Sequence, residues 1–149
     1  MLKQKLREEL KRSMLARDEL TTSVLRMVLS AINYYEIEKG GAGYEANEED
    51  VMSVVQKEAK QRRDSIEEFT KAGRQELADK EQKELEILQK YLPEQLSEEE
   101  IKKLVDEAIS QTGASNISDM GKVMGALMPK IKGKADGSLV SKIVKESLI

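Results

Sequence analysis

Cysteine and histidine are both absent from the 149 residues of this chain. The lack of cysteine excludes disulfides, thiol nucleophiles and thiolate metal sites, and it fits a reducing compartment. We therefore expect a cytoplasmic protein. The lack of histidine removes the side chain best suited to proton transfer near neutral pH, which is also the commonest metal ligand. We accordingly expect neither a bound metal nor a cofactor.

Aromatic residues, prolines and long apolar runs are also scarce. Aromatics make up 3% of the chain and there are two prolines, whereas 36% of the residues are charged. This balance is typical of helices with solvated outer faces. The most apolar window, residues 24–32, is interrupted by Arg26 and Ser30 and is too short to span a bilayer, and the first residues do not resemble a signal peptide. We expect an all-α protein without a membrane anchor.

Apolar periodicity and capping residues predict four helices in the N-terminal part. Apolar residues recur at every fourth position from Leu2 to Met14 and predict an amphipathic first helix. A second helix should end at the glycine-rich run Gly40-Gly41-Ala42-Gly43. Asn47 is a good N-cap for a long third helix, which Gly73 should close in the left-handed conformation. A fourth helix completes an N-terminal set of hairpins or a bundle.

The segment around Pro93 is the best candidate for a linker. Proline disfavours helical geometry in the residue before it, so the fourth helix must end before this position. Ser97, with Glu100 three residues later, forms a capping box that starts a new helix. We therefore predict an N-terminal helical domain over residues 1–92 and a C-terminal domain over residues 93–149.

Three short helices are predicted in the C-terminal domain. Gly113 should cap the end of the first, Pro129 should end the second, and Asp136 should cap the start of the third. The first two have apolar residues at positions i, i+3, i+4 and i+7, and the third carries Leu139, Val140, Ile143, Val144 and Leu148, as expected of a small three-helix core.

Positive charge is concentrated near the C-terminal end of a protein whose formal net charge is −3. Residues 120–149 contain six lysines and two acidic residues, which makes this stretch locally +4. Lys130, Lys132 and Lys134 flank Gly133 on a predicted loop that leads into the last helix, where the N-terminal backbone N–H groups favour an anion. Phosphate contact and an ordinary solvated surface are both open interpretations of this loop.

Gly121 and Gly125 lie one helical turn apart and predict a bare strip on the second C-terminal helix. Close packing against a neighbouring helix is the favoured interpretation. The approach of a ribose-phosphate backbone or of a partner helix is the alternative.

A second basic cluster, formed by Lys60, Arg62 and Arg63, lies on the predicted third helix. Intrahelical ion pairs with Asp64 and Glu67 explain Lys60 and Arg63 well, because each acid lies four residues further along. Arg62 falls on the apolar stripe, and we expect it to reach an acidic residue on another helix.

No set of residues indicates catalysis. Three carboxylates, those of Glu81, Glu84 and Glu86, are interpreted as a solvated face, since nothing around them suggests burial that would shift a pKa. Phosphate-binding glycine loops and metal-ligand spacings are also missing. We therefore expect no catalytic residue and no catalysis by this chain alone.

Five segments carry a family resemblance: Val24–Met27, Lys60–Phe69, Lys71–Arg74, Tyr91–Pro93 and Met120–Gly125. Together they look like the GatB/YqeY family in its free-standing form, and the match covers essentially the whole chain. The resemblance implies a two-part helical fold similar to the tail of the B subunit of the glutamine-dependent tRNA amidotransferase and to tails on some bacterial glutaminyl-tRNA synthetases. Those tails hold tRNA near its outer corner.

By this resemblance, tRNA is the expected partner and the C-terminal domain would dock on its backbone. The candidate contact residues are Lys122, Lys130, Lys132, Gly133, Lys134 and Lys142. The family label also carries a glutamine-dependent carbon–nitrogen ligase activity, which in the amidotransferase belongs to other domains and subunits. There are two alternatives: a protein-interaction adaptor for a tRNA synthetase or amidotransferase, and an accessory in amide-forming chemistry. The oligomeric state is left open.

Overall fold

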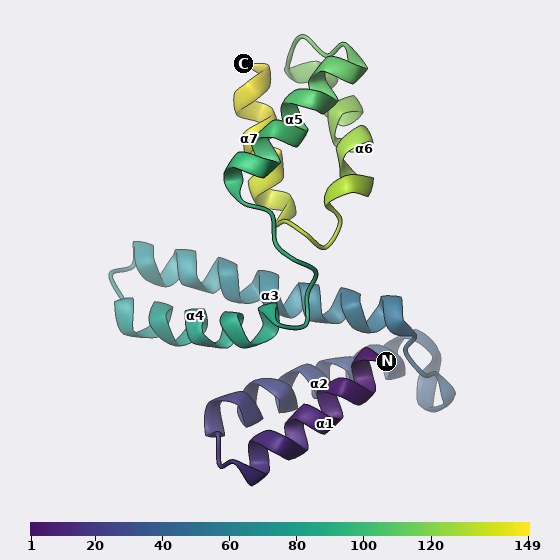
Figure 1. Cartoon of the computed structure of the whole chain (residues 1–149), viewed down its shortest axis with the longest axis vertical. Helices are drawn as coiled ribbons and strands as arrows, with labels where there is room; N and C mark the ends of the chain where they lie inside the picture. Colours follow the sequence, from purple (N-terminus) through teal and green to yellow (C-terminus); the bar gives the residue numbers. More distant parts are fainter. The chain divides into compact units, whose positions relative to one another are not determined.

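A computed structural model describes residues 1–149 and shows an all-α protein, which confirms the predicted fold class (Figure 1). The α-helices in chain order are α1 (Leu2–Leu15), α2 (Glu19–Gly40), α3 (Glu48–Lys71), α4 (Gln75–Gln89), α5 (Glu98–Thr112), α6 (Met120–Ile131) and α7 (Gly137–Leu148). Short 3-10 turns, η1 (Gly41–Gly43) and η2 (Ile117–Asp119), precede α3 and α6. No helix is both long and apolar enough to cross a membrane.

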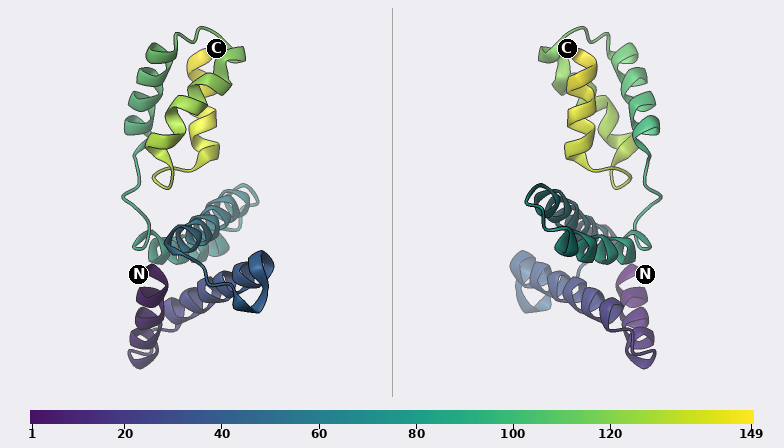
Figure 2. Two further views of the ribbon diagram at one scale, coloured as in Figure 1. Left: turned by 90° about the vertical axis from the view of Figure 1, so that its right-hand side faces the viewer. Right: turned by 90° about the vertical axis from the view of Figure 1, so that its left-hand side faces the viewer.

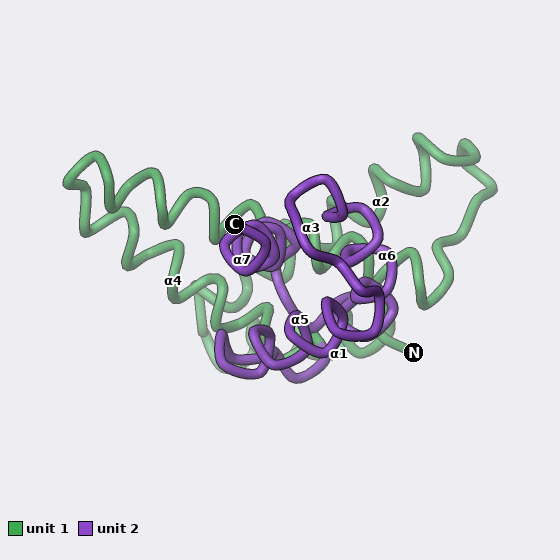
Figure 3. Tube along the Cα trace, turned by 90° about the horizontal axis from the view of Figure 1, so that it is seen from above, with its two compact units in different colours: residues 1–92 green, residues 93–149 purple.

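The chain divides into two compact units, which cover residues Met1–Leu92 and Pro93–Ile149 (Figure 3). Each unit has a hydrophobic core of its own. In the following, unit 1 and unit 2 refer to these two parts.

Unit 1 consists of two antiparallel helix pairs, α1 with α2 and α3 with α4 (Figures 1 and 2). The apolar stripes of all four helices meet in one core, whose fully buried members include Leu6, Leu25, Ile32, Val55 and Leu88. Removing these side chains from water is the main stabilising term, at roughly 1.5–3 kcal/mol for each large one.

Local capping chemistry fixes where the helices of unit 1 begin and end. The Asn47 side chain accepts a hydrogen bond from the Asp50 N–H at 2.8 Å, and the Asp50 carboxylate accepts one from the Asn47 N–H at 3.2 Å. This pair forms a capping box at the start of α3, where Asn47 was predicted as the cap. Gly73 follows α3 with φ of 72° and so takes the predicted left-handed conformation.

Unit 2 is a bundle of α5, α6 and α7 around a small aliphatic core (Figure 1). Ile101, Val105, Val123, Leu127 and Val144 are all at most 1% exposed.

The predicted caps of unit 2 are also present. Ser97 and Glu100 form the capping box that starts α5, with bonds of 3.2 and 2.9 Å. Gly113 is left-handed at φ of 67°, and the Asp136 carboxylate accepts a hydrogen bond from the Ser138 N–H at the start of α7.

Pro129 does not end α6, contrary to the sequence-based prediction. The helix continues to Ile131, and the next backbone N–H, that of Lys132, still donates to the Met128 carbonyl at 2.9 Å. Proline removes a single helical hydrogen bond, and here that loss falls in the last turn. The burial of Ile131 in the core, at 1% exposed, stabilises this final turn.

Candidate nucleic-acid interface

The predicted RNA-contacting lysines are exposed on three consecutive elements of unit 2. Lys122 and Lys130 lie on α6, Lys132 and Lys134 lie in the loop that follows, and Lys142 lies on α7. The structure therefore keeps this positive charge at the surface, as an interaction with a polyanion requires.

The loop between α6 and α7 is held by hydrogen bonds. Gly133 takes the left-handed conformation with φ of 79°, and its carbonyl accepts a hydrogen bond from the Gln95 side-chain amide at 2.9 Å. The Lys134 N–H donates to the Ile131 carbonyl, and the Lys134 carbonyl accepts from the Leu96 N–H, both at 2.8 Å. The loop backbone is thus fixed on both sides of Gly133, a connection to residues 95–96 that sequence periodicity does not reveal.

Lys122 lies beside a carboxylate that offsets part of its positive field. Asp119 lies one turn before it, and the pKa of this carboxyl group is lowered, mainly by the hydrogen bond that it accepts from the Ser115 N–H, with Lys122 adding a smaller attraction. The ionised Asp119 therefore offsets part of the Lys122 charge.

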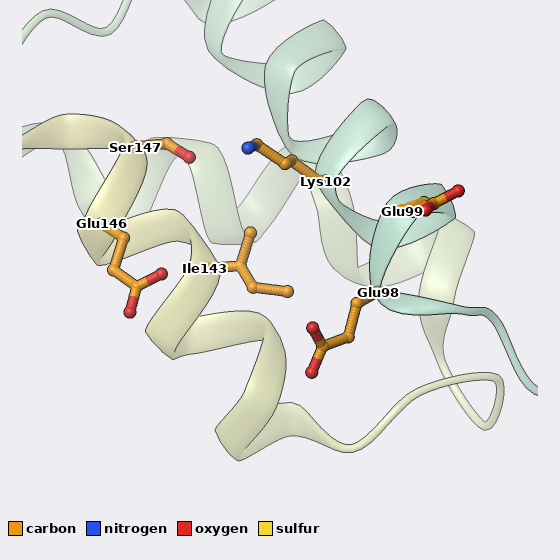
Figure 4. Close-up of a pocket in the computed structure, with 6 residues that line it drawn as sticks. All are labelled: Glu98, Glu99, Lys102, Ile143, Glu146 and Ser147. Carbon is orange, nitrogen blue, oxygen red and sulfur yellow. The ribbon is translucent and has the colours of Figure 1, made fainter.

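A hollow of about 420 Å³ between α5 and α7 is acidic, in contrast to the basic loop after α6 (Figure 4). Its lining includes three carboxylates and one lysine around an apolar centre: Glu98, Glu99, Glu146, Lys102, Ile143 and Ser147. Such a lining repels phosphate. Charge is therefore segregated within unit 2, and a polyanion would be directed to α6 and the loop after it.

Gly121 and Gly125 form an open strip on α6 rather than a packing surface. A Cβ atom built at either glycine would meet nothing within 4 Å, and both residues are exposed. The favoured interpretation, close packing against a helix of the same chain, is therefore wrong. The core-facing positions of α6 are Val123, Leu127 and Ile131, which leaves the glycines on the outer face.

Replacing Gly121 and Gly125 by alanine should stabilise the protein, by up to about 1 kcal/mol at each position, because alanine favours the helix and meets no steric obstacle. Chemical denaturation followed by circular dichroism measures this gain. Gly113→Ala is the control and should instead lower the stability, because its φ of 67° strains any residue that has a side chain. A loss of stability in the α6 variants would show that the strip is packed after all.

The second basic cluster does not form a phosphate-binding patch. Lys60 is paired with Asp64 at 3.6 Å, as predicted. Arg62 is only 4% exposed, and its guanidinium lies 2.9 Å from the Glu58 carboxylate and 3.8 Å from that of Glu84. Arg62 therefore bridges α3 to α4, as expected from its place on the apolar stripe. Arg63, half-buried on α3, also has an interaction partner.

The interpretation of Glu84 as part of a solvated face is wrong, since this residue is 7% exposed. Burial, followed by the repulsion of Glu84, raises the pKa of the neighbouring Glu81, which is half-buried. Glu86 is exposed as expected. Sequence spacing could have located Glu84, because it lies four residues before the core residue Leu88 on the inner face of α4. The Glu84 carboxylate lies 3.8 Å from the guanidinium of the buried Arg62, which compensates its charge.

Comparison with known proteins shows to which family the chain belongs. The model of the YqeY-like protein family matches residues 3–148. The chain belongs to this family. The GatB/YqeY resemblance carried by the sequence motifs is therefore confirmed, and the match extends over both units of this YqeY-like protein.

Curated relatives of this YqeY-like protein are called "Altered inheritance of mitochondria protein 41, mitochondrial". The one from Lachancea thermotolerans is 36% identical over 76% of this chain and 60% of its own length. The Saccharomyces cerevisiae protein (strain YJM789) is 33% identical over 82% of this chain and 68% of its own length. The Pyrenophora tritici-repentis protein is 41% identical over 64% of this chain and 54% of its own length. The matched region thus spans between about half and two thirds of each relative.

These names contradict the cytoplasmic localisation expected from the sequence. The relatives are described as mitochondrial proteins. The expectation rested on the absence of cysteine, and this absence excludes disulfides without distinguishing one reducing compartment from another. Composition therefore carried no information on the compartment.

Proposed function

We propose that this YqeY-like protein is an RNA-binding accessory module, with tRNA as its ligand, and that unit 2 provides the contact surface. One observation carries the proposal. Lysines of α6, of the α6–α7 loop and of α7 are exposed in a unit whose hollow between α5 and α7 is acidic. Phosphate contacts from such a surface supply affinity without reading bases.

The composition of unit 2 favours folded RNA over single strands. Residues 93–149 contain no aromatic side chain, so the unit has no platform on which unpaired bases could stack. A surface of lysines and exposed helix backbone instead suits the phosphates and 2′-hydroxyl groups of a structured RNA. The Gly121–Gly125 strip adds a place where a ribose-phosphate backbone can come close to α6.

The test is the salt dependence of tRNA binding. Changing Lys130, Lys132 and Lys134 together to alanine should weaken binding and lower the slope of log K against log salt by two to three, because about three phosphate contacts are lost. Fluorescence anisotropy with labelled folded tRNA, from low to moderate salt, measures both quantities.

A matched control removes the same amount of charge elsewhere. Lys83, Lys102 and Lys103 are exposed on α4 and α5, and their replacement by alanine should leave the slope nearly unchanged. Equal effects of the two triple variants would indicate a general charge effect. An unchanged slope in the variant of the loop would contradict the proposed surface.

The open face of α6 favours one second candidate, an adaptor that docks on an aminoacyl-tRNA synthetase or an amidotransferase. A partner helix can approach the backbone at Gly121 and Gly125 because no side chain of this chain covers them. Association that survives ribonuclease and high salt would favour this role over RNA binding. The role of an accessory in glutamine-dependent carbon–nitrogen bond formation rests on the family association alone.

A further inference from the structure

The outer face of α2 carries large apolar side chains that are about half or more exposed. Met27 is 48% exposed, Tyr34 is 71% exposed and Ile37 is 65% exposed. At 100° per residue these three, together with the exposed Ser23 and Ser30, fall within an arc of roughly 80°. Isolated apolar residues are normal on a surface, whereas a continuous stripe along one helix is typical of an interface.

The opposite face of α2 is already occupied. The helix packs on α1, α3 and α4, and its inward residues Val24, Leu25, Val28 and Ile32 are fully buried. The exposed stripe is therefore not the core-facing side of an incompletely packed helix. It is a second apolar face on the same helix.

The stripe is close to self-complementary about Ser30. Ser23 and Ile37 lie seven positions on either side of this residue, and Met27 and Tyr34 lie three and four positions away. If a second α2 lay antiparallel with the two-fold axis at Ser30, each large side chain of one copy would lie opposite a smaller or flexible one of the other. Tyr34 would face Met27, Ile37 would face Ser23, and the two serines would meet at the centre. Such an arrangement is an isologous contact.

A hollow in the surface lies at the position that this register assigns to Ile37. Ser23 and Met27 line a depression of about 530 Å³ at the junction of α1 and α2. Its other lining residues are Met14, Thr22 and four charged residues, Arg17, Asp18, Glu19 and Arg26. Ile37 of the second copy, opposite Ser23, would enter it. The hollow adjoins the stripe, because Ser23 and Met27 belong to both, and the same register places Ile37 of the second copy beside it.

We infer that the protein forms a two-fold symmetric dimer through antiparallel α2 helices, with Ser30 at the axis. The interface belongs to unit 1, and the inference is independent of RNA binding by unit 2.

Disulfide trapping tests the register without background, because the chain has no cysteine. Ser30→Cys should give a covalent dimer on mild oxidation, since the two residues meet at the axis. Met27→Cys alone should give little, because an antiparallel pair separates its two copies by about 9 Å along the helix. A mixture of Met27→Cys and Tyr34→Cys should cross-link. Ser110→Cys, exposed on α5, is the control that should remain monomeric.

Sedimentation equilibrium tests the association itself. Tyr34→Lys combined with Ile37→Lys should raise the dimer dissociation constant by at least about 30-fold, as expected for removal of central apolar anchors. Ile117→Lys, which changes a 48% exposed residue of unit 2, should leave it unchanged. Self-cross-linking of every single α2 cysteine variant would overturn the antiparallel register. A wild-type protein that stays monomeric at high micromolar concentration would overturn the dimer.

Discussion

Arg62→Met is expected to lower the free energy of unfolding by about 3–5 kcal/mol, which is the usual effect of removing one member of a buried ion pair. The Arg62 guanidinium donates to the Glu58 carboxylate at 2.9 Å and to the Glu58 carbonyl at 3.0 Å, and it lies 3.8 Å from the carboxylate of Glu84. Methionine would fill much of the space but would leave two largely buried carboxylates without their cation. Denaturant unfolding measures the loss.

Replacing the two carboxylates by amides tests whether their uncompensated charge causes the loss of stability in Arg62→Met. Adding Glu58→Gln and Glu84→Gln to the Arg62→Met variant should restore a large part of the stability, because neutral amides remove the uncompensated charge. Lys71→Met is the control for loss of an exposed pair, since Lys71 and Glu67 are both well exposed, and it should change stability little. A loss below about 1 kcal/mol in Arg62→Met would show that the ion network is energetically neutral.

The pH dependence of the Arg62→Met variant follows from the same network. Burial and Glu84 raise the pKa of Glu81. An acid whose pKa is raised on folding favours the folded state at low pH. This contribution is lost as pH rises from the acid's ordinary pKa through its raised pKa in the folded state. Without Arg62 the repulsion among the carboxylates grows, so the destabilisation should be larger at pH 7 than at pH 4.

The second large effect is expected from Leu127→Ala, which should unfold unit 2 while unit 1 stays folded. Leu127 is fully buried at the centre of the core of unit 2, and truncation of such a residue destabilises by about 2–5 kcal/mol. A core of this size rarely provides more than about 3–5 kcal/mol in total. The change therefore removes most of the stability of the unit.

Amide hydrogen exchange or NMR can follow the two units separately. In Leu127→Ala the backbone amides of α5, α6 and α7 should lose protection, whereas those of α1 to α4 keep it. The tRNA binding that we propose for unit 2 should disappear with its fold. Ile149→Ala is the matched control, because this residue is 89% exposed. Simultaneous loss of protection in both units would show that they unfold as one cooperative body.

Local chemistry explains which features the sequence allowed us to predict. Helix positions follow from apolar periodicity, and the caps at Asn47, Ser97 and Asp136 depend on residues within three positions of one another. Left-handed Gly73 and Gly113 follow from the conformations that only glycine adopts without strain. Arg62 was also correctly expected to cross the bundle, because a charged residue on an apolar stripe requires a partner.

Features that depend on neighbours distant in sequence were missed or wrongly interpreted. Glu84 is buried because α4 lies against Arg62 of α3. Gly121 and Gly125 turn outward because the aliphatic residues of α6 fill the core of unit 2. The hydrogen bonds from residues 95–96 to the basic loop, and the second apolar face of α2, also depend on how the helices pack.

The sequence by itself therefore determined the all-α class, the helix boundaries to within a few residues, the concentration of lysine near the C-terminus and the family. Each of these is a property of short segments or of a residue pattern. Only the tertiary structure decided which charges are buried, which glycine face is open and which apolar stripe lacks a partner. The physical reason is that the periodicity of a helix shows that it has an apolar face but not which other element covers that face.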